Sequence, residues 1–232
     1  SMDYRITSHG VSAHSSLPIL GKNAIKPLIE FIQDIDTTST QIAKEVKGTA
    51  FDFSNMISKF SQQLPQAIQA AQVEEVLSGL VVSNTLIKGG VQVNSIPESA
   101  EAEFNIRTIP EYNNNQVKQL FNNTLAKHNE SGANLVSDLY LDLDPVLTTG
   151  KNNLIDTAKN IGDRVFDTDL QAEPTVAVTD ASNLLKSKDE SFPLLVFGPG
   201  ENPHQLDECV SKDKYLTFID FYIELLTTYS QK

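Results

Sequence analysis

Apolar side chains recur along this chain with two different periods, one typical of strands and the other typical of helices. Residues 98–109 alternate most regularly, with apolar side chains at positions 100, 102, 104 and 106. This two-residue period predicts a strand with one buried face. Residues 3–8, 80–88 and 135–143 are predicted as strands on the same ground.

Helical spacing appears in two further segments. A helix is predicted from residue 23, followed by a polar break at residues 37–40. Its expected inward stripe consists of Ile25, Leu28, Ile29, Ile32 and Ile35. Residues 114–128 predict a second helix, which should end near Gly132 because glycine commonly terminates helices. Residues 37–78 form an excursion with helical stretches at 51–64 and 67–77.

The order of these elements is strand, helix, excursion, strand, strand, helix, strand. That order is typical of the split βαβ, ferredoxin-like arrangement, in which two helices cover one antiparallel sheet. We therefore predict one α+β domain, of βαββαβ order, over residues 3–143.

From residue 144 the pattern changes to α/β. Helices are predicted at residues 152–165 and 215–229, and short apolar strands at 175–179 and 194–197. The closing helix has an apolar stripe on one face, which consists of Leu216, Ile219, Tyr222, Ile223 and Leu226. Two strands are fewer than the roughly 4–6 of a usual sheet, so residues 144–232 are predicted to be part of a domain.

Composition limits the classes of function. The chain has 232 residues, with 18 Lys and Arg against 30 Asp and Glu, so its net charge is −12. Such a charge repels phosphate backbones, and a nucleic-acid partner is not expected. No apolar run reaches the roughly 18 residues needed to cross a membrane. The single cysteine argues against an internal disulfide and favours a cytoplasmic location, and only four histidines remain as soft metal ligands.

Five short motifs stand out, and they follow one another in a fixed order. They are GVSAHSS at residues 10–16 with Pro18 and GKNAI at 21–25, GGVQVNSIP at 89–97, NIR at 105–107, TDA at 179–181, and GPG at 198–200 with His204 and Glu208. In this order the motifs resemble those of the M20 family of metallopeptidases and amidohydrolases. Within that family the chain is most similar to the succinyl-diaminopimelate desuccinylase and acetylornithine deacetylase group.

The resemblance implies a fold and an activity. Residues 3–143 would be a ferredoxin-like lid, through which two subunits form a homodimer, and residues 144–232 the C-terminal part of an α/β zinc-hydrolase domain. The whole enzyme would use two zinc ions per subunit to hydrolyse an amide bond of a small N-acyl amino acid or peptide. The H-x-D and E-E motifs that supply most zinc ligands in the family are not found, so we expect this chain alone to be a fragment without hydrolytic activity.

The resemblance also assigns roles to residues of the lid. His14 would reach the active site of the partner subunit and stabilise the oxyanion of the intermediate. Asn94 and Arg107 would bind the carboxylate of the substrate. The simpler alternatives are a loop histidine for His14 and a strand-face ion pair of Arg107 with Glu103 or Asp138.

In the second segment the resemblance implies that His204 is a zinc ligand. It also implies that Thr179 and Asp180 contact the substrate or support residues that do. The alternatives are a surface histidine and, for Asp180, a helix N-cap. A different class of function also stays open. The chain could be a dimerisation or interaction module without catalysis, or an amino-acid sensor built on the ferredoxin-like domain.

Overall fold

The computed structural model describes residues 1–48, 51–60, 69–148, 152–175, 178–189, 191–200 and 206–231. The chain divides into two compact units. The first comprises Ser1–Val146 and Thr175–Lys186, and the second Leu147–Pro174 and Ser187–Lys232.

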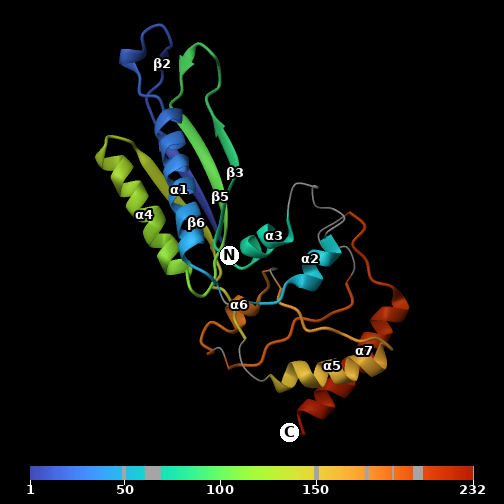
Figure 1. Ribbon diagram of the computed structural model, residues 1–232. Coiled ribbons are helices and arrows are strands. Elements are labelled where there is room, and N and C mark those ends of the chain that lie inside the picture. The colour runs from blue at the N-terminus through green and yellow to red at the C-terminus, as the bar shows by residue number, and fades with distance from the viewer. Residues whose placement is uncertain are drawn as a thin grey trace. The chain divides into compact units, whose positions relative to one another are not determined.

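A four-stranded sheet forms the centre of the first unit (Figure 1). Its strands are β1 (Met2–His9), β3 (Val81–Gly89), β5 (Ser99–Arg107) and β6 (Leu135–Asp142). They lie in the order β3-β5-β1-β6, and each neighbouring pair is antiparallel. The predicted α+β class, with one antiparallel sheet and covering helices, is confirmed.

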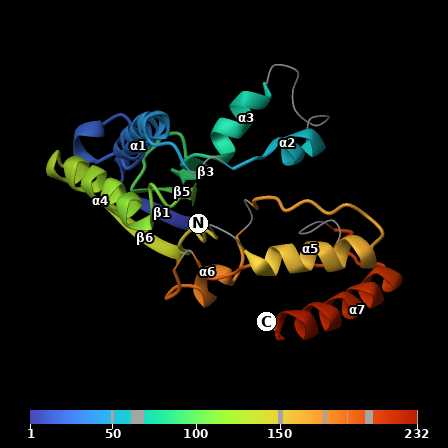
Figure 2. The same ribbon diagram turned by 60° about the horizontal axis from the view of Figure 1, so that its bottom comes forward.

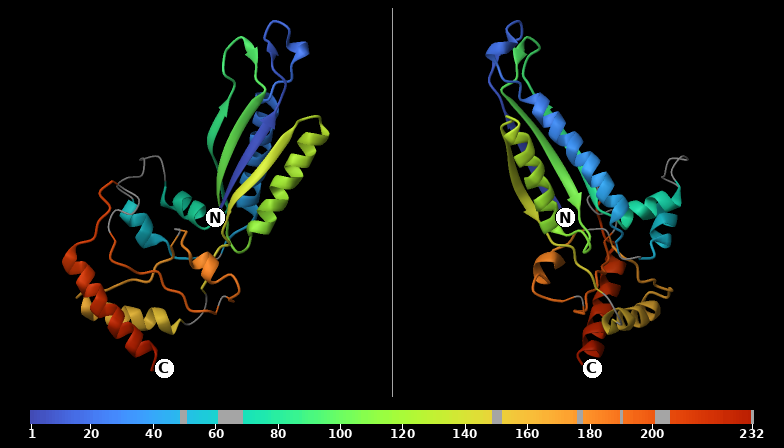
Figure 3. Two further views of the ribbon diagram at one scale, coloured as in Figure 1. Left: turned by 180° about the vertical axis from the view of Figure 1, so that it is seen from behind. Right: turned by 60° about the vertical axis from the view of Figure 1, so that its left-hand side comes forward.

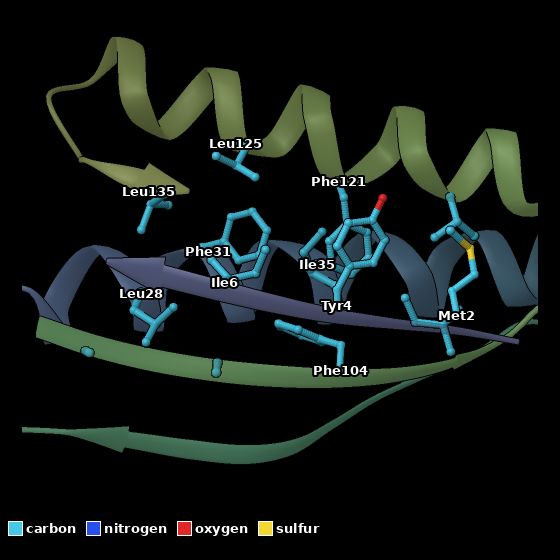
Figure 4. Close-up of a cluster of buried hydrophobic side chains, with 14 of the residues drawn as sticks. Met2, Tyr4, Ile6, Leu28, Phe31, Ile35, Phe104, Phe121, Leu125 and Leu135 are labelled. Carbon is cyan, nitrogen blue, oxygen red and sulfur yellow. The ribbon is translucent and has the colours of Figure 1, made fainter. Parts of the chain in front are cut away.

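The helices α1 (Ile25–Glu45) and α4 (Asn114–Glu130) cover one face of this sheet (Figure 3). Four aromatic rings pack between the layers (Figure 4). The ring of Phe121 lies 4.4 Å from that of Tyr4, 5.4 Å from that of Phe104 and 6.0 Å from that of Phe31, measured between centroids. All four residues are at most 3% exposed, so the alternating strand residues and the helical stripes meet in one core.

The predictions for α1 need two corrections. The polar break at residues 37–40 does not end this helix, which continues to Glu45. Ser39 is buried there and its hydroxyl donates to the carbonyl of Asp36 at 3.2 Å, so tertiary packing sustains helix through a polar stretch. The inward stripe is also rotated from the predicted one, because Phe31 is fully buried whereas Ile29 is 41% exposed.

The opposite face of the sheet carries paired charges. Arg5 binds Glu103 at 3.0 Å, and Lys88 binds Glu101 at 2.8 Å. The hydroxyl of Tyr140 donates to Glu103 at 3.2 Å. This cross-strand pattern is that of a face turned to water, so the sheet has a single apolar face.

The excursion is helical where the structure describes it. It contains α2 (Ser54–Phe60) and α3 (Ala70–Leu77). Residues 61–64 of the first predicted helical stretch and 67–68 of the second lie outside the described residues, as do residues 65 and 66 between them.

The second unit is built on two helices, α5 (Asn153–Val165) and α7 (Lys212–Tyr229), which lie side by side (Figure 2). Their core includes Phe218 and Phe221, and Phe197 packs its ring 5.0 Å from that of Phe218. The apolar stripe predicted for the closing helix is not the face that packs in this unit: its five residues are between 38% and 69% exposed, while Phe218, Phe221 and Leu225 are buried. The helix carries two apolar stripes, and α5 covers the second.

The predicted strand at residues 194–197 is also wrong, since these residues are irregular. A strand needs a neighbour for its ladder of hydrogen bonds, and no other strand occurs among the described residues of this unit. The strand predicted at 175–179 falls partly outside the described residues, and residues 175, 178 and 179 are not in a strand. In the part of the chain that is described, no helix has the length and hydrophobicity to cross a membrane.

Candidate functional site

The loop that carries His14 follows β1 and is shaped by two glycines. A Cβ on Gly10 would lie 2.1 Å from the carbonyl oxygen of Lys22, and one on Gly21 would lie 2.9 Å from the carbonyl oxygen of Val11. Neither position can accept a side chain without moving backbone. The glycines therefore allow residues 11 and 22 to pair, which closes the loop at its base.

His14 and Asn94 come together although they are 80 residues apart in the sequence. The strand β2 (Ala13–His14) pairs with β4 (Ser95–Ile96), and His14 lies opposite Ser95. The amide of Ser15 donates to the carbonyl oxygen of Asn94 at 2.9 Å. We call this end of the first unit, residues 11–22 and 90–97, the tip; the side chains of His14 and Asn94 are exposed there.

Serines surround His14 at the tip, and the motif analysis gave them no role. The Nδ1 atom of His14 lies 2.8 Å from the Oγ of Ser16, and the hydroxyls of Ser12 and Ser95 lie 3.2 Å apart. The signal was present in the sequence, because hydroxyl residues two positions before and after a histidine can reach its ring or its neighbouring strand.

The tip also exposes large apolar side chains to an unusual degree. Two valines of the β3–β4 connection are 95% and 100% exposed, and the short 3₁₀ helix η1 (Pro18–Leu20) adds residues that are 89% and 67% exposed. The set consists of Leu17, Ile19, Leu20, Val91 and Val93. Clustered apolar exposure of this kind marks interaction surfaces more often than single exposed residues do.

Arg107 lies at the other end of the same unit. It is the last residue of β5, whose first residue, Ser99, follows the tip. Eight residue steps of about 3.4 Å separate the two ends of that strand by roughly 27 Å. Within one chain the structure therefore does not bring Arg107 next to His14 or Asn94. We expected Asn94 and Arg107 on adjacent strands, but Asn94 lies in the β3–β4 connection and Arg107 ends β5.

The structure also tests the simpler interpretation of Arg107. Glu103, one of its two predicted partners, binds Arg5 instead, at 3.0 Å. The side chain of Arg107 is exposed and makes no ion pair or hydrogen bond with Glu103, Asp138 or another described residue. Its guanidinium is thus available to a ligand as far as the described residues show.

A polar network centred on the buried Asn114 fixes the backbone beside Arg107. Thr108 donates to the side-chain oxygen of Asn114 at 2.7 Å, and Asn114 donates to Asp142 at 2.7 Å. Burial alone would raise the pKa of Asp142, but hydrogen bonds from Lys118 and Asn114 outweigh it and lower that pKa. Asn114 is 1% exposed, so this network holds the end of β5 against α4 and β6.

Thr179 and Asp180 belong to the first compact unit, just before the short helix α6 (Ala181–Leu184). The side chain of Asp180 makes no capping hydrogen bond, so its predicted alternative as an N-cap is not supported. Thr179 has that role: its Oγ1 accepts from the amide of Ala181 at 3.2 Å.

The predicted zinc ligand His204 lies outside the described residues. Among the residues that the structure describes, no group of three or more His, Cys, Asp and Glu side chains could hold a metal ion. The described residues therefore do not fit a zinc site by themselves, and zinc binding stays a prediction.

Comparison with known proteins supplies the family. The model of the M20 peptidase dimerisation domain matches residues 1–133. These residues contain the strands β1, β3 and β5, both covering helices and the tip, whereas β6 lies just beyond them. The chain belongs to the M20 peptidase family. It is 35% identical over its whole length to a protein of Staphylococcus epidermidis named probable succinyl-diaminopimelate desuccinylase, and 33% identical over 99% of its length to one of the same name from Staphylococcus aureus.

Solved M20 structures share the fold. An M20 family metallo-carboxypeptidase from Sulfolobus solfataricus matches 97% of this chain with a TM-score of 0.71 at 15% identity, and 58% of its own length is covered. A di-peptidase from Saccharomyces cerevisiae matches the whole chain with a TM-score of 0.66 at 14% identity, over 54% of its own length. The chain spans about half the length, 56%, of the curated relatives that it matches.

Proposed function

We propose that this chain comprises the lid, residues 3–143, and the C-terminal part of the catalytic domain, residues 144–232, of a metal-dependent amidohydrolase. Its substrate would be a small N-acyl amino acid of the succinyl-diaminopimelate type. The names of the relatives and the order of the five motifs support this proposal. Homodimers would form through the lid, in keeping with the description of the matching family model.

The observation that carries the proposal is the separation of the candidate residues. His14 and Asn94 share the tip, whereas Arg107 lies roughly 27 Å away along β5. One substrate of amino-acid size cannot contact both ends of the strand. A site that uses all three residues therefore takes its tip from one subunit and its Arg107 from another.

Each residue can contribute a defined interaction to such a shared site. The guanidinium of Arg107 can bind a carboxylate with two parallel hydrogen bonds, which orients the amino-acid part of the substrate. The imidazole of His14 can donate to the oxygen of the amide carbonyl, where negative charge develops during attack. The amide of Asn94 can donate and accept beside it. A metal held by residues outside the described part would supply the activated water.

The two edges of the sheet differ in how well they suit a second copy. The edge strand β3 exposes Leu86 by 40% and Ile87 by 55%, and its one charged residue, Lys88, is paired with Glu101. It also leads directly into the exposed valines of the tip. The other edge strand, β6, carries Asp138 and Asp142. Asp142 is paired with Lys118, whereas Asp138 has no ion pair with another described residue, and its charge would repel that of a second copy. We therefore assign β3 to the dimer interface.

Binding of substrate to the purified chain tests the assignment of Arg107. N-succinyl-diaminopimelate is titrated into the dimer by calorimetry, with Arg107→Ala as the variant and Arg5→Ala as the matched control. Loss of a bidentate, charge-assisted pair should weaken binding about 10- to 100-fold, and Arg107→Lys should restore part of it. Arg5 is engaged by Glu103, so its loss should leave binding unchanged. Equal affinities of the Arg107→Ala and Arg5→Ala variants would contradict the proposal.

A further inference from the structure

Two contacts from one residue converge on a single nitrogen of the His14 ring. The Oγ of Ser16 lies 2.8 Å from Nδ1, and the backbone amide of Ser16 donates to the same Nδ1 at 3.3 Å. A backbone N–H can only donate a hydrogen bond, so Nδ1 must be the acceptor. The hydroxyl, which can rotate, can then donate to the same nitrogen, whose single lone pair the two donors share.

The backbone around Ser16 is fixed on both sides, which makes this geometry a property of the fold. The amide of Leu17 donates to the carbonyl oxygen of His14 at 2.9 Å and closes a tight turn. The amide of Ser15 is bound to Asn94 at 2.9 Å, which anchors the turn to the β3–β4 connection. The amide of Ser16 is left inside the turn, directed at the ring.

A neutral imidazole carries one proton, and an accepting Nδ1 leaves that proton on Nε2. We propose that Ser16 is a positioning residue that holds neutral His14 in the Nε2–H tautomer. The tip then presents an N–H donor, the group that a carbonyl oxygen or oxyanion requires. The use of this N–H donor in catalysis rests on the proposed function. The tautomer of His14 is a property of the tip alone.

The second serine beside His14 supplies a matched control. The hydroxyl of Ser12 lies 3.2 Å from that of Ser95, and like Ser16 it is exposed at the tip. Among the described residues, the ring of His14 is bonded by Ser16 and not by Ser12. Replacing Ser12 by alanine costs the tip one hydroxyl without touching the ring of His14. Substitution of either serine would loosen the tip in general. Only substitution of Ser16 should change the tautomer of His14.

Nitrogen-15 NMR of the histidine side chains tests the proposal on the chain as it is. Two-bond proton–nitrogen correlations at about pH 8.5, where imidazoles are neutral, distinguish the two tautomers. The four histidines are assigned by single His→Gln substitutions. We expect Nδ1 of His14 to resonate as an unprotonated nitrogen. Ser16→Ala should raise the ratio of the Nδ1–H to the Nε2–H tautomer about threefold, because the backbone donor remains.

Ser16→Thr keeps the hydroxyl and should restore the original ratio, and Ser12→Ala should leave it unchanged. An Nδ1–H tautomer in the unsubstituted chain would overturn the proposal, and so would equal ratios in the Ser16→Ala and Ser12→Ala variants. The outcome does not depend on substrate binding by Arg107. If calorimetry shows no role for Arg107 in substrate binding but NMR shows the Nε2–H tautomer of His14, the proposed function is refuted and the role of Ser16 still holds.

Discussion

Replacing Phe121 by alanine should remove much of the stability of the lid. Its ring is fully buried and contacts three other aromatic rings, with centroids 4.4, 5.4 and 6.0 Å away. Truncation of a buried phenylalanine costs about 3–5 kcal/mol, and each aromatic pair contributes about 0.5–1.5 kcal/mol within that loss. With three pairs lost, we expect the upper half of the range, a loss of about 4–5 kcal/mol in the free energy of unfolding.

Urea denaturation followed by circular dichroism measures this loss, with Tyr140→Phe as the control. Tyr140 is 49% exposed on the other face of the sheet, and losing its hydroxyl should cost less than about 1 kcal/mol. Because domains are stable by only about 5–15 kcal/mol, the lid of the Phe121→Ala variant should be close to unfolding. A loss below about 2 kcal/mol would show that the rings do not pack as described and would refute the reasoning.

Three further changes test other parts of the first unit. Gly10→Ala places a Cβ 2.1 Å from the carbonyl of Lys22 and should cost about 1–3 kcal/mol, measured by thermal unfolding. Asn113→Ala removes the side chain that accepts from two amides at the start of α4 and should cost about 1 kcal/mol in the same assay. A hydrogen bond from Lys127 lowers the pKa of Asp34 below its ordinary value of 3.8. The ionised carboxylate therefore stabilises the fold at pH values above 3.8, and this stabilisation is lost as the pH falls through the lowered pKa. Asp34→Asn should therefore flatten the acid side of the stability–pH curve, and an unchanged curve would contradict the assignment.

Local patterns predicted the first unit well because its elements obey simple periods. The alternation of residues 98–109 matches β5, where the apolar residues Ala100 to Ile106 at even positions are all buried. The element order then limited the topology to the sheet that is observed. By contrast, the length of α1 depends on the burial of Ser39, a tertiary effect that no local pattern contains.

The second unit shows where periodicity fails. Apolar residues occupy two faces of α7, and the sequence does not say which of them meets α5. The motifs identified His14 and Asn94, whose proximity the β2–β4 pairing supplies. The predicted strand at residues 98–109 already separates Arg107 from the motif at 89–97 by the length of the strand, and the structure confirms that Arg107 lies at the far end of β5. The tautomer of His14, by contrast, depends on turn geometry.

Sedimentation equilibrium shows whether two copies of this chain pair through the β3 edge, as we propose. Ile87 on β3 and Val136 on β6 are 55% and 51% exposed, so lysine at either position should leave the fold intact. We expect a dimer, twice the 25.5 kDa of the chain, that Ile87→Lys converts to a monomer and Val136→Lys does not affect. A monomeric unsubstituted chain, or a dimer that only Val136→Lys dissociates, would contradict this proposal.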